Sequence, residues 1–159
     1  MKIIYCCYGG SHSSVTVAAI HVGILPTTNI PSTQQLLSVP YYDKQTGKDH
    51  GYFHYIGIDS DKNPVYAVGK HNLGKHFEEI IRQIADIFQI KQKELILVDT
   101  MPCVNYTMMI GGFLSRRLGI TLIGRPIVIW GTKKAYWRFV NLVNSIKITV
   151  ASRKNNGGH

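Results

Sequence analysis

The stretch "KIIYCCYGGSHSSVTVAAIHVG", residues 2–23, decides the fold. Residues 2–8 are apolar or aromatic at nearly every position, which predicts an interior strand covered on both faces. Gly9 and Gly10 then interrupt the strand, and from Ser13 small and apolar residues follow at helical spacing until Gly23. A strand, a glycine turn and a helix in this order are typical of α/β proteins that bind phosphate at the turn.

Strand and helix patterns continue to alternate along the rest of the chain. Residues 28–43 predict one short helix, and residues 52–70 predict two strands joined by a polar turn. The clearest amphipathic helix lies at 73–90, and an apolar strand at 94–99 follows it. The remaining segments predict a helix at 102–119, one long or two short strands at 120–130, and a last helix at 132–147.

This order of elements predicts a single α/β domain at residues 1–150. Strands that alternate with helices favour a three-layer arrangement, with a mainly parallel sheet and helices on both faces. The pair of strands in 52–70 is the exception, because its short polar turn predicts an antiparallel hairpin, either at an edge of the sheet or as a lid. Residues 151–159 predict a flexible basic tail.

Composition limits the classes of function. The chain has 159 residues, of which 45% are hydrophobic and 17% charged, and a formal net charge of +9. This excess favours anionic partners, which include phosphorylated small molecules, nucleotides and nucleic acid. No apolar run is long enough to span a bilayer, and three cysteines without disulfide-like spacing fit a reducing compartment. We therefore expect a cytoplasmic protein without a membrane partner.

The turn after the first strand is the first candidate site. Gly9 and Gly10 let a ligand approach the backbone, and the hydroxyl groups of Ser11, Ser13 and Ser14 surround the start of the next helix. His12, at the centre, is a candidate proton donor or acceptor. The turn is P-loop-like in position but lacks the lysine of the nucleotide-binding loop. A tight turn with a serine cap is the competing interpretation.

Asp99, at the end of the second buried strand, is the other candidate catalytic residue. A carboxylate beside a phosphate loop commonly holds Mg²⁺, directly or through water, and it can also act as a base. Capping of the following helix competes with both roles. Thr100 and Asn105 are the polar residues that would supplement either role.

Three further residues have chemistry whose role the sequence does not assign. Cys103 lies near a predicted helix start, where a thiolate is favoured, whereas Cys7 ends a buried strand and is expected to be inert. His50 follows Asp49, which can orient its ring or share a metal, but a polar loop explains the pair equally well. No metal site is assigned.

Several stretches together resemble one family. They are "CYGGSHSSV" at the start, "PYYD" and "DHG" in the middle, and "LVDT", "LSR" and "GTKKAY" in the second half. They resemble a family of short proteins from spore-forming Gram-positive bacteria whose domain has no assigned function. The resemblance covers about residues 2–147 and implies no catalytic residue.

Two hypotheses of function follow. The first is a phosphate- or nucleotide-binding protein, or a small phosphotransfer or phosphohydrolase enzyme, that uses the glycine- and serine-rich loop. The second is a non-enzymatic regulatory protein that binds nucleic acid or an acidic partner through a basic surface, in which "KKAYWRF" at 133–139 interleaves aromatic and basic residues.

Overall fold

A computed structural model describes residues 1–155 of the chain. Its four-stranded sheet has the order β2-β3-β1-β4. Strand β1 (Lys2–Cys7) runs parallel to β3 (Pro64–Gly69) and to β4 (Leu95–Asp99), and the edge strand β2 (His54–Ile58) is antiparallel to β3. The predicted α/β domain with one antiparallel hairpin is therefore confirmed.

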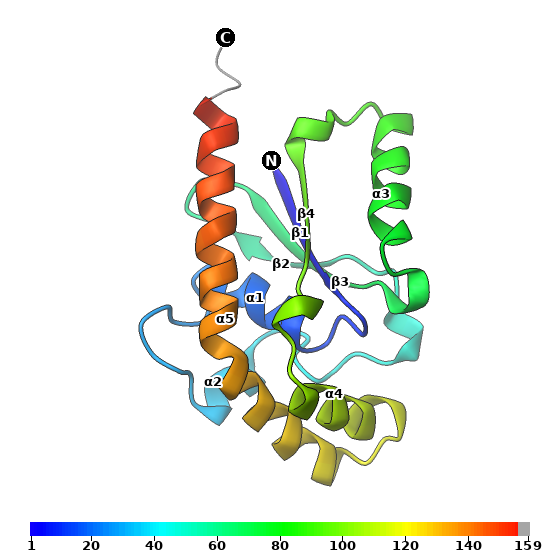
Figure 1. The fold of residues 1–159 in the computed structure, drawn as a ribbon, viewed down its shortest axis with the longest axis vertical. Helices are drawn as coiled ribbons and strands as arrows, with labels where there is room; N and C mark the ends of the chain where they lie inside the picture. Colours follow the sequence, from blue (N-terminus) through cyan, green and yellow to red (C-terminus); the bar gives the residue numbers. More distant parts are fainter. Residues whose placement is uncertain (156–159) are drawn as a thin grey trace.

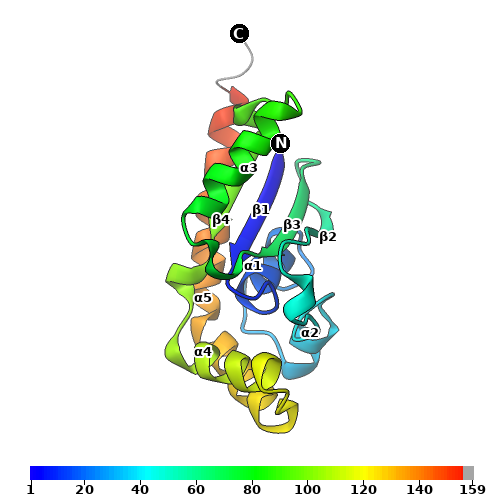
Figure 2. The same cartoon turned by 90° about the vertical axis from the view of Figure 1, so that its right-hand side faces the viewer.

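Helices cover both faces of the sheet (Figures 1 and 2). Helix α1 (Ser13–His21) and the long α5 (Thr121–Asn155) lie on one face, where Ile3 and Tyr5 of β1 join the main core. Helix α3 (His76–Ile87) lies on the other, where Ile4 and Cys6 pack with Phe77. Successive side chains of β1 thus point to opposite layers, and both layers are apolar, as the uninterrupted apolar run predicts.

Short helices complete the connections. Helix α2 (Thr33–Ser38) begins with a capping box in which Ser32 accepts from the amide of Gln35 and the Gln35 side chain accepts from the amide of Ser32. Helix α4 (Tyr106–Gly112) continues into a π-helical segment (Phe113–Arg117). Single 3₁₀ turns occur at Gly47–Asp49, His71–Leu73, Gln92–Glu94 and Met101–Cys103. Within residues 1–155, no helix combines the length and the apolar character that crossing a membrane requires.

The prediction of strands at 120–130 is wrong, because this segment forms the first three turns of α5. Helices α4 and α5 form an antiparallel hairpin that lies below the sheet (Figure 1). Glycines make this close packing feasible: a Cβ at Gly111 would lie 2.4 Å from the Val128 nitrogen, and one at Gly124 would lie 2.3 Å from the Ser115 nitrogen. Packing of the helices outweighs the strand preference of the β-branched residues.

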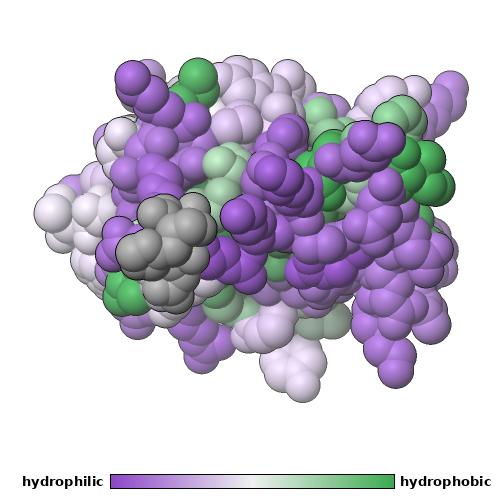
Figure 3. All heavy atoms as spheres, turned by 90° about the horizontal axis from the view of Figure 1, so that it is seen from above, coloured by the Kyte–Doolittle hydropathy of each residue, from purple (hydrophilic) through white to green (hydrophobic). Residues whose placement is uncertain are grey.

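The same helix extends further than predicted at its other end. Residues 151–155, which the sequence assigns to a basic tail, are the last turn of α5. Arg153 donates to the carbonyl of Leu95 at 3.3 Å, and Lys154 pairs with Asp61 at 3.1 Å. The rest of the predicted tail lies outside the described residues. Figure 3, which views the molecule from this end, shows mostly hydrophilic side chains, with hydrophobic ones gathered toward the side of α3.

A chain of buried hydrogen bonds crosses the main core between β1, α1 and the β2–β3 turn. Nδ1 of His21 lies 2.6 Å from the Tyr5 hydroxyl, and Nε2 lies 3.2 Å from Asp59. Burial raises the pKa of Asp59, but hydrogen bonds from Asn63, Asp61 and His21 outweigh it, and the pKa lies below its usual range. The ionised carboxylate accepts from Nε2–H, so Tyr5 donates to Nδ1 of a neutral imidazole.

We expect this network to make folding stability sensitive to mild acid. Burial lowers the pKa of His21 despite the opposing hydrogen bond to Asp59. The contribution of His21 is complete above its unfolded pKa of about 6.5 and is lost as pH falls through that value toward the lowered pKa of the folded state, because the unfolded chain takes up the proton first.

Urea unfolding measured between pH 8 and pH 5.5 tests the expectation. His21→Gln should flatten the pH dependence of the unfolding free energy. His76→Gln, which changes an exposed imidazole paired with Glu79, should leave the wild-type slope in place. Equal slopes for wild type and His21→Gln would contradict the assignment.

Candidate functional site

The loop from Tyr8 to Ser14 joins β1 to α1 at the carboxyl edge of the parallel strands. Gly10 has a φ of +71°, and a Cβ there would lie 2.6 Å from the nitrogen of Gly69 at the end of β3. A Cβ at Gly69 would in turn lie 2.9 Å from the carbonyl carbon of Gly9. Gly10 and Gly69 therefore let the loop pack on the end of β3. Gly9 differs, because a Cβ at Gly9 would have no atom within 4 Å.

The three predicted serines are buried, and the hydroxyls of Ser13 and Ser14 have protein partners. Ser13 accepts from the hydroxyl of Thr100 at 2.9 Å, which brings two of the predicted residues together. The Ser14 hydroxyl lies 3.2 Å from the sulfur of Cys7, and that sulfur accepts from the amide of Gly10 at 3.1 Å. Ser11 is buried, and its carbonyl accepts from the amide of Asp43 at 3.0 Å.

The start of α1 has no side-chain cap. His12 occupies the N-cap position but makes no capping hydrogen bond. Within residues 1–155, the amides of Ser13, Ser14 and Val15 donate to no protein acceptor, although all three residues are buried. Buried N–H groups require an acceptor. The positive end of the helix dipole makes an anion the favoured one.

His12 instead belongs to a cluster around the buried carboxylate of Asp43. Nε2 of His12 lies 3.1 Å from Oδ1, to which Ser115 donates at 2.8 Å. Nε of Arg125 lies 2.7 Å from Oδ2, and Nε of Arg116 lies 3.3 Å from Oδ1. These four partners come from the loop, the π-helical segment and α5.

The electrostatics of this cluster favour an ionised Asp43. Burial alone raises the pKa of the carboxyl group, but hydrogen bonds from His12, Arg125 and Ser115 outweigh it and hold the pKa well below its usual range. A neutral His12 then donates Nε2–H to Asp43 and keeps the lone pair on Nδ1. A Cβ at Gly112 would lie 3.3 Å from that Nδ1. His12 and Asp43 thus form a dyad in which the carboxylate fixes the orientation of a partly exposed imidazole, as general acid–base chemistry requires.

Gln45 joins the cluster to the loop. Its side chain is 4% exposed, and neither Oε1 nor Nε2 has a hydrogen-bond partner among the described residues. Oε1 would lie 2.7 Å from a Cβ at Gly10, and the backbone carbonyl of Gln45 accepts from Arg116 at 3.2 Å. After the amides at the start of α1, the side-chain amide of Gln45 is thus a second buried polar group beside the loop without a hydrogen-bond partner among the described residues.

Asp99 lies on the opposite face of the sheet from His12. Its register partner on β1 is Cys6, on the α3 side. Lys70 donates to its carboxylate at 2.6 Å, and the amide of Met101 donates at 3.0 Å. The carboxylate is thus held between Lys70 and the first amide of the turn at 101–103, and a metal ion would have to displace the ammonium group. No group of three or more His, Cys, Asp or Glu residues able to hold a metal occurs in residues 1–155.

The other predicted residues are distributed around this edge. Asn105 caps α4 by accepting from the amide of Met108 at 2.9 Å, and it donates to the carbonyl of Gly131 at 2.8 Å. The ring of His50 lies 4.7 Å from that of His71, centroid to centroid, near Tyr8. The expectation of a lowered thiol pKa at Cys103 is wrong, because burial raises that pKa.

The sequence interpretation missed most of the Asp43 cluster. "PYYD" enters the sequence analysis only as one stretch of the family resemblance, and Arg116 and Arg125 are not among the predicted site residues. A signal does exist in the backbone, because Asp43 has a φ of +51°, which is unusual for a residue other than glycine. This backbone conformation is evident in the structure and is not encoded in a recognisable sequence pattern.

Comparison with known proteins supplies a family and no activity. No curated protein and no solved structure matches the chain. One family model matches residues 2–148, and its description is a protein of unknown function, DUF3189. Since this match covers the sheet, the loop and the Asp43 cluster, the chain belongs to the DUF3189 family.

Proposed function

We propose that the protein binds a phosphorylated small molecule or nucleotide at the loop from Tyr8 to Ser14. The observation that carries the proposal is the buried, uncapped start of α1, where three amides lack an acceptor among residues 1–155. A phosphate oxygen is the acceptor that such a helix start favours. The unpartnered amide of Gln45 and the guanidinium of Arg116 lie beside the same loop and support an anionic ligand.

The His12–Asp43 dyad supports phosphotransfer or phosphohydrolysis as the reaction class. An ionised Asp43 holds Nε2 of the imidazole and fixes the orientation of the ring, so Nδ1 is the atom that would deliver a proton to a leaving oxygen or accept one from water. Asp99 would act only after release from Lys70, and Mg²⁺ would need ligands from the substrate. Release of inorganic phosphate from a bound ester is the assay for this class.

A substitution at Gly9 tests the site without disturbing the fold. Gly9→Val places its side chain in open space, so we expect an unchanged melting temperature. The same side chain obstructs ligand approach and should weaken binding of orthophosphate, nucleotides or phosphosugars by about tenfold or more in isothermal titration. Gly10→Val is the contrasting variant: its Cβ would lie 2.6 Å from Gly69, so it should destabilise the fold itself. Absence of millimolar binding by the wild type to all three ligand classes would refute the proposal.

A basic surface is the second candidate, and the distribution of charge favours it. All nine acidic residues lie between Asp43 and Asp99, whereas residues 100–159 contain nine of the 18 Lys and Arg residues and no Asp or Glu. Nucleic acid or an acidic protein would match this half. It ranks second because Tyr136 and Phe139 are buried and cannot stack on bases. A single-stranded oligonucleotide in the same titration, with affinity that falls as salt rises, would favour it.

Two further proposals concern the organisms that have the protein and its cellular compartment. We expect the family to occur in spore-forming Gram-positive bacteria and the protein to act in the cytoplasm. The three free cysteines are consistent with a reducing compartment.

A further inference from the structure

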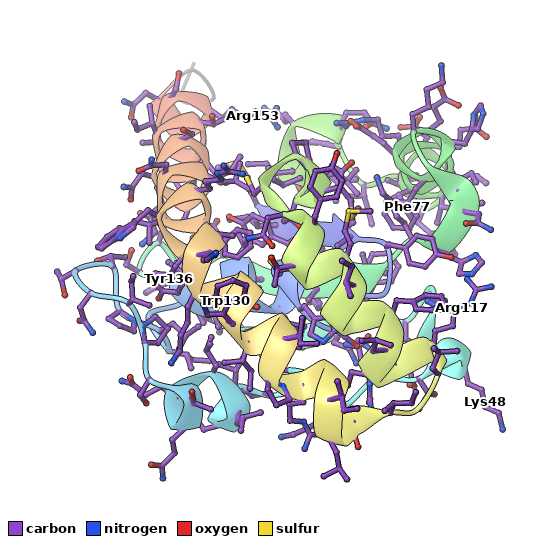
Figure 4. All side chains as sticks on the ribbon, turned by 60° about the horizontal axis from the view of Figure 1, so that its bottom comes forward. Lys48, Phe77, Arg117, Trp130, Tyr136 and Arg153 are labelled. Carbon is purple, nitrogen blue, oxygen red and sulfur yellow. The ribbon has the colours of Figure 1, made fainter. Side chains whose placement is uncertain are left out.

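A groove runs between α2 and the first half of α5. Its volume is about 510 Å³, within the range of small-molecule sites. The apolar lining is mainly aliphatic, with Leu37, Pro126 and Ile129 beside the single aromatic ring of Trp130. Figure 4 shows Trp130 on α5. On one face of this ring, Nζ of Lys134 lies 3.5 Å from the centroid, so a flat aromatic ligand cannot stack on that face.

The charged side chains that line the groove are both cationic. Nε of Arg125 is bound to Asp43, which fixes the guanidinium, and neither Nη atom has a hydrogen-bond partner within residues 1–155. The Arg125 side chain is 43% exposed. Lys133 donates to the hydroxyl of Thr33 across the groove at 3.0 Å and retains two further N–H donors. A fixed guanidinium whose two NH₂ groups are free suits a carboxylate or phosphate.

We propose that this groove binds a free organic anion with an unbranched aliphatic chain and an oxyanion head. The chain would lie on Leu37, Ile129 and Pro126, and the head would lie against Arg125 and Lys133. Burial of aliphatic surface drives the association, and the two cations select the charge of the head. The groove shares Arg125 with the Asp43 cluster, but the proposal does not rest on the loop site, because the occupant contacts α2 and α5 and requires no phosphate at the start of α1.

Tryptophan fluorescence measures binding directly. The chain has two tryptophans, so Trp137→Phe leaves Trp130 as the only reporter. We expect decanoate and decyl phosphate, kept below their micelle concentrations, to change its emission with saturation. Decanol should bind about tenfold more weakly, as expected for loss of one charge-assisted contact, and decyltrimethylammonium should not compete.

Two lysines of α5 provide a matched pair of variants in this background. Lys133→Gln removes a cation that lines the groove and should weaken decanoate about tenfold, whereas Lys147→Gln removes the same charge further along the helix and should leave affinity within about twofold. Leu122→Ser, at the rim, should also weaken binding. Ile148→Ser, an exposed apolar position near the other end of α5, should not.

Four results would overturn the proposal. They are equal affinity for decanol and decanoate, equal loss from both lysine variants, binding to anionic phospholipid vesicles without binding to the monomeric anions, and a stable dimer whose formation excludes decanoate. The third result would identify a membrane surface, and the fourth a second copy of the chain. Decanoate binding that persists in Gly9→Val, with orthophosphate binding lost, would separate this site from the loop.

Discussion

Replacement of Asp43 by Asn is expected to lower the free energy of unfolding by about 3–5 kcal/mol, the range for removing one partner of a buried ion pair. The neutral side chain would leave Arg116 and Arg125 without their carboxylate and present an NH₂ group to donors. His12 would also lose the acceptor that orients its ring. Urea or guanidinium unfolding monitored by circular dichroism provides the measurement.

The control is another ion-paired aspartate that is exposed. Asp61 pairs with Lys154 at 3.1 Å, and the side chains are 51% and 41% exposed. Asp61→Asn should change stability by no more than about 1 kcal/mol. A similar small effect from Asp43→Asn would mean that the cluster does not hold the loop, the π-helical segment and α5 together.

Replacement of Gly124 by Val should have an effect of similar size by a steric route. A Cβ at this position would lie 2.3 Å from the Ser115 nitrogen and 2.8 Å from the Gly111 carbonyl oxygen, which are backbone atoms that cannot rotate away. The α4–α5 hairpin would have to separate, and we expect a loss of about 3 kcal/mol or more, above the usual overpacking range because backbone blocks relaxation.

Alanine at the same position makes the test more specific. Gly→Ala in a helix interior normally stabilises by about 1 kcal/mol, so destabilisation by Gly124→Ala would identify the close approach as the cause. Asn144→Ala, at an exposed position of the same helix, should be neutral or slightly stabilising. A stabilised Gly124→Ala protein would show that the hairpin has room for a methyl group.

Local patterns predicted the elements whose neighbours in sequence are also their neighbours in space. The hairpin of β2 and β3 and the amphipathic α3 follow directly from alternation and helical periodicity. The helical conformation of the first half of α5 does not follow from its local sequence pattern. Its run of Ile, Val and Trp has strand preference, and only the glycine contacts with α4 explain why it is helical.

The candidate site likewise has a part that could be predicted from the sequence and a part that could not. Gly9, Gly10 and His12 could be identified because the loop is continuous in sequence. The rest of the cluster could not be identified in this way. Asp43 is 31 residues from His12 in the sequence, and Arg125 is 82 residues from Asp43. Asp99 was identified as a candidate from its place at a strand end, but sequence does not specify which face of the sheet it occupies.

The length of α5 determines when the main core can form during synthesis. Ile3 and Tyr5 leave the ribosome first, yet the layer that covers them includes Phe139, Val143 and Val150 near the end of the described chain. Until α5 emerges, the main core lacks the apolar side chains that this helix contributes to it. We therefore expect the core to close only after most of the domain has been synthesised.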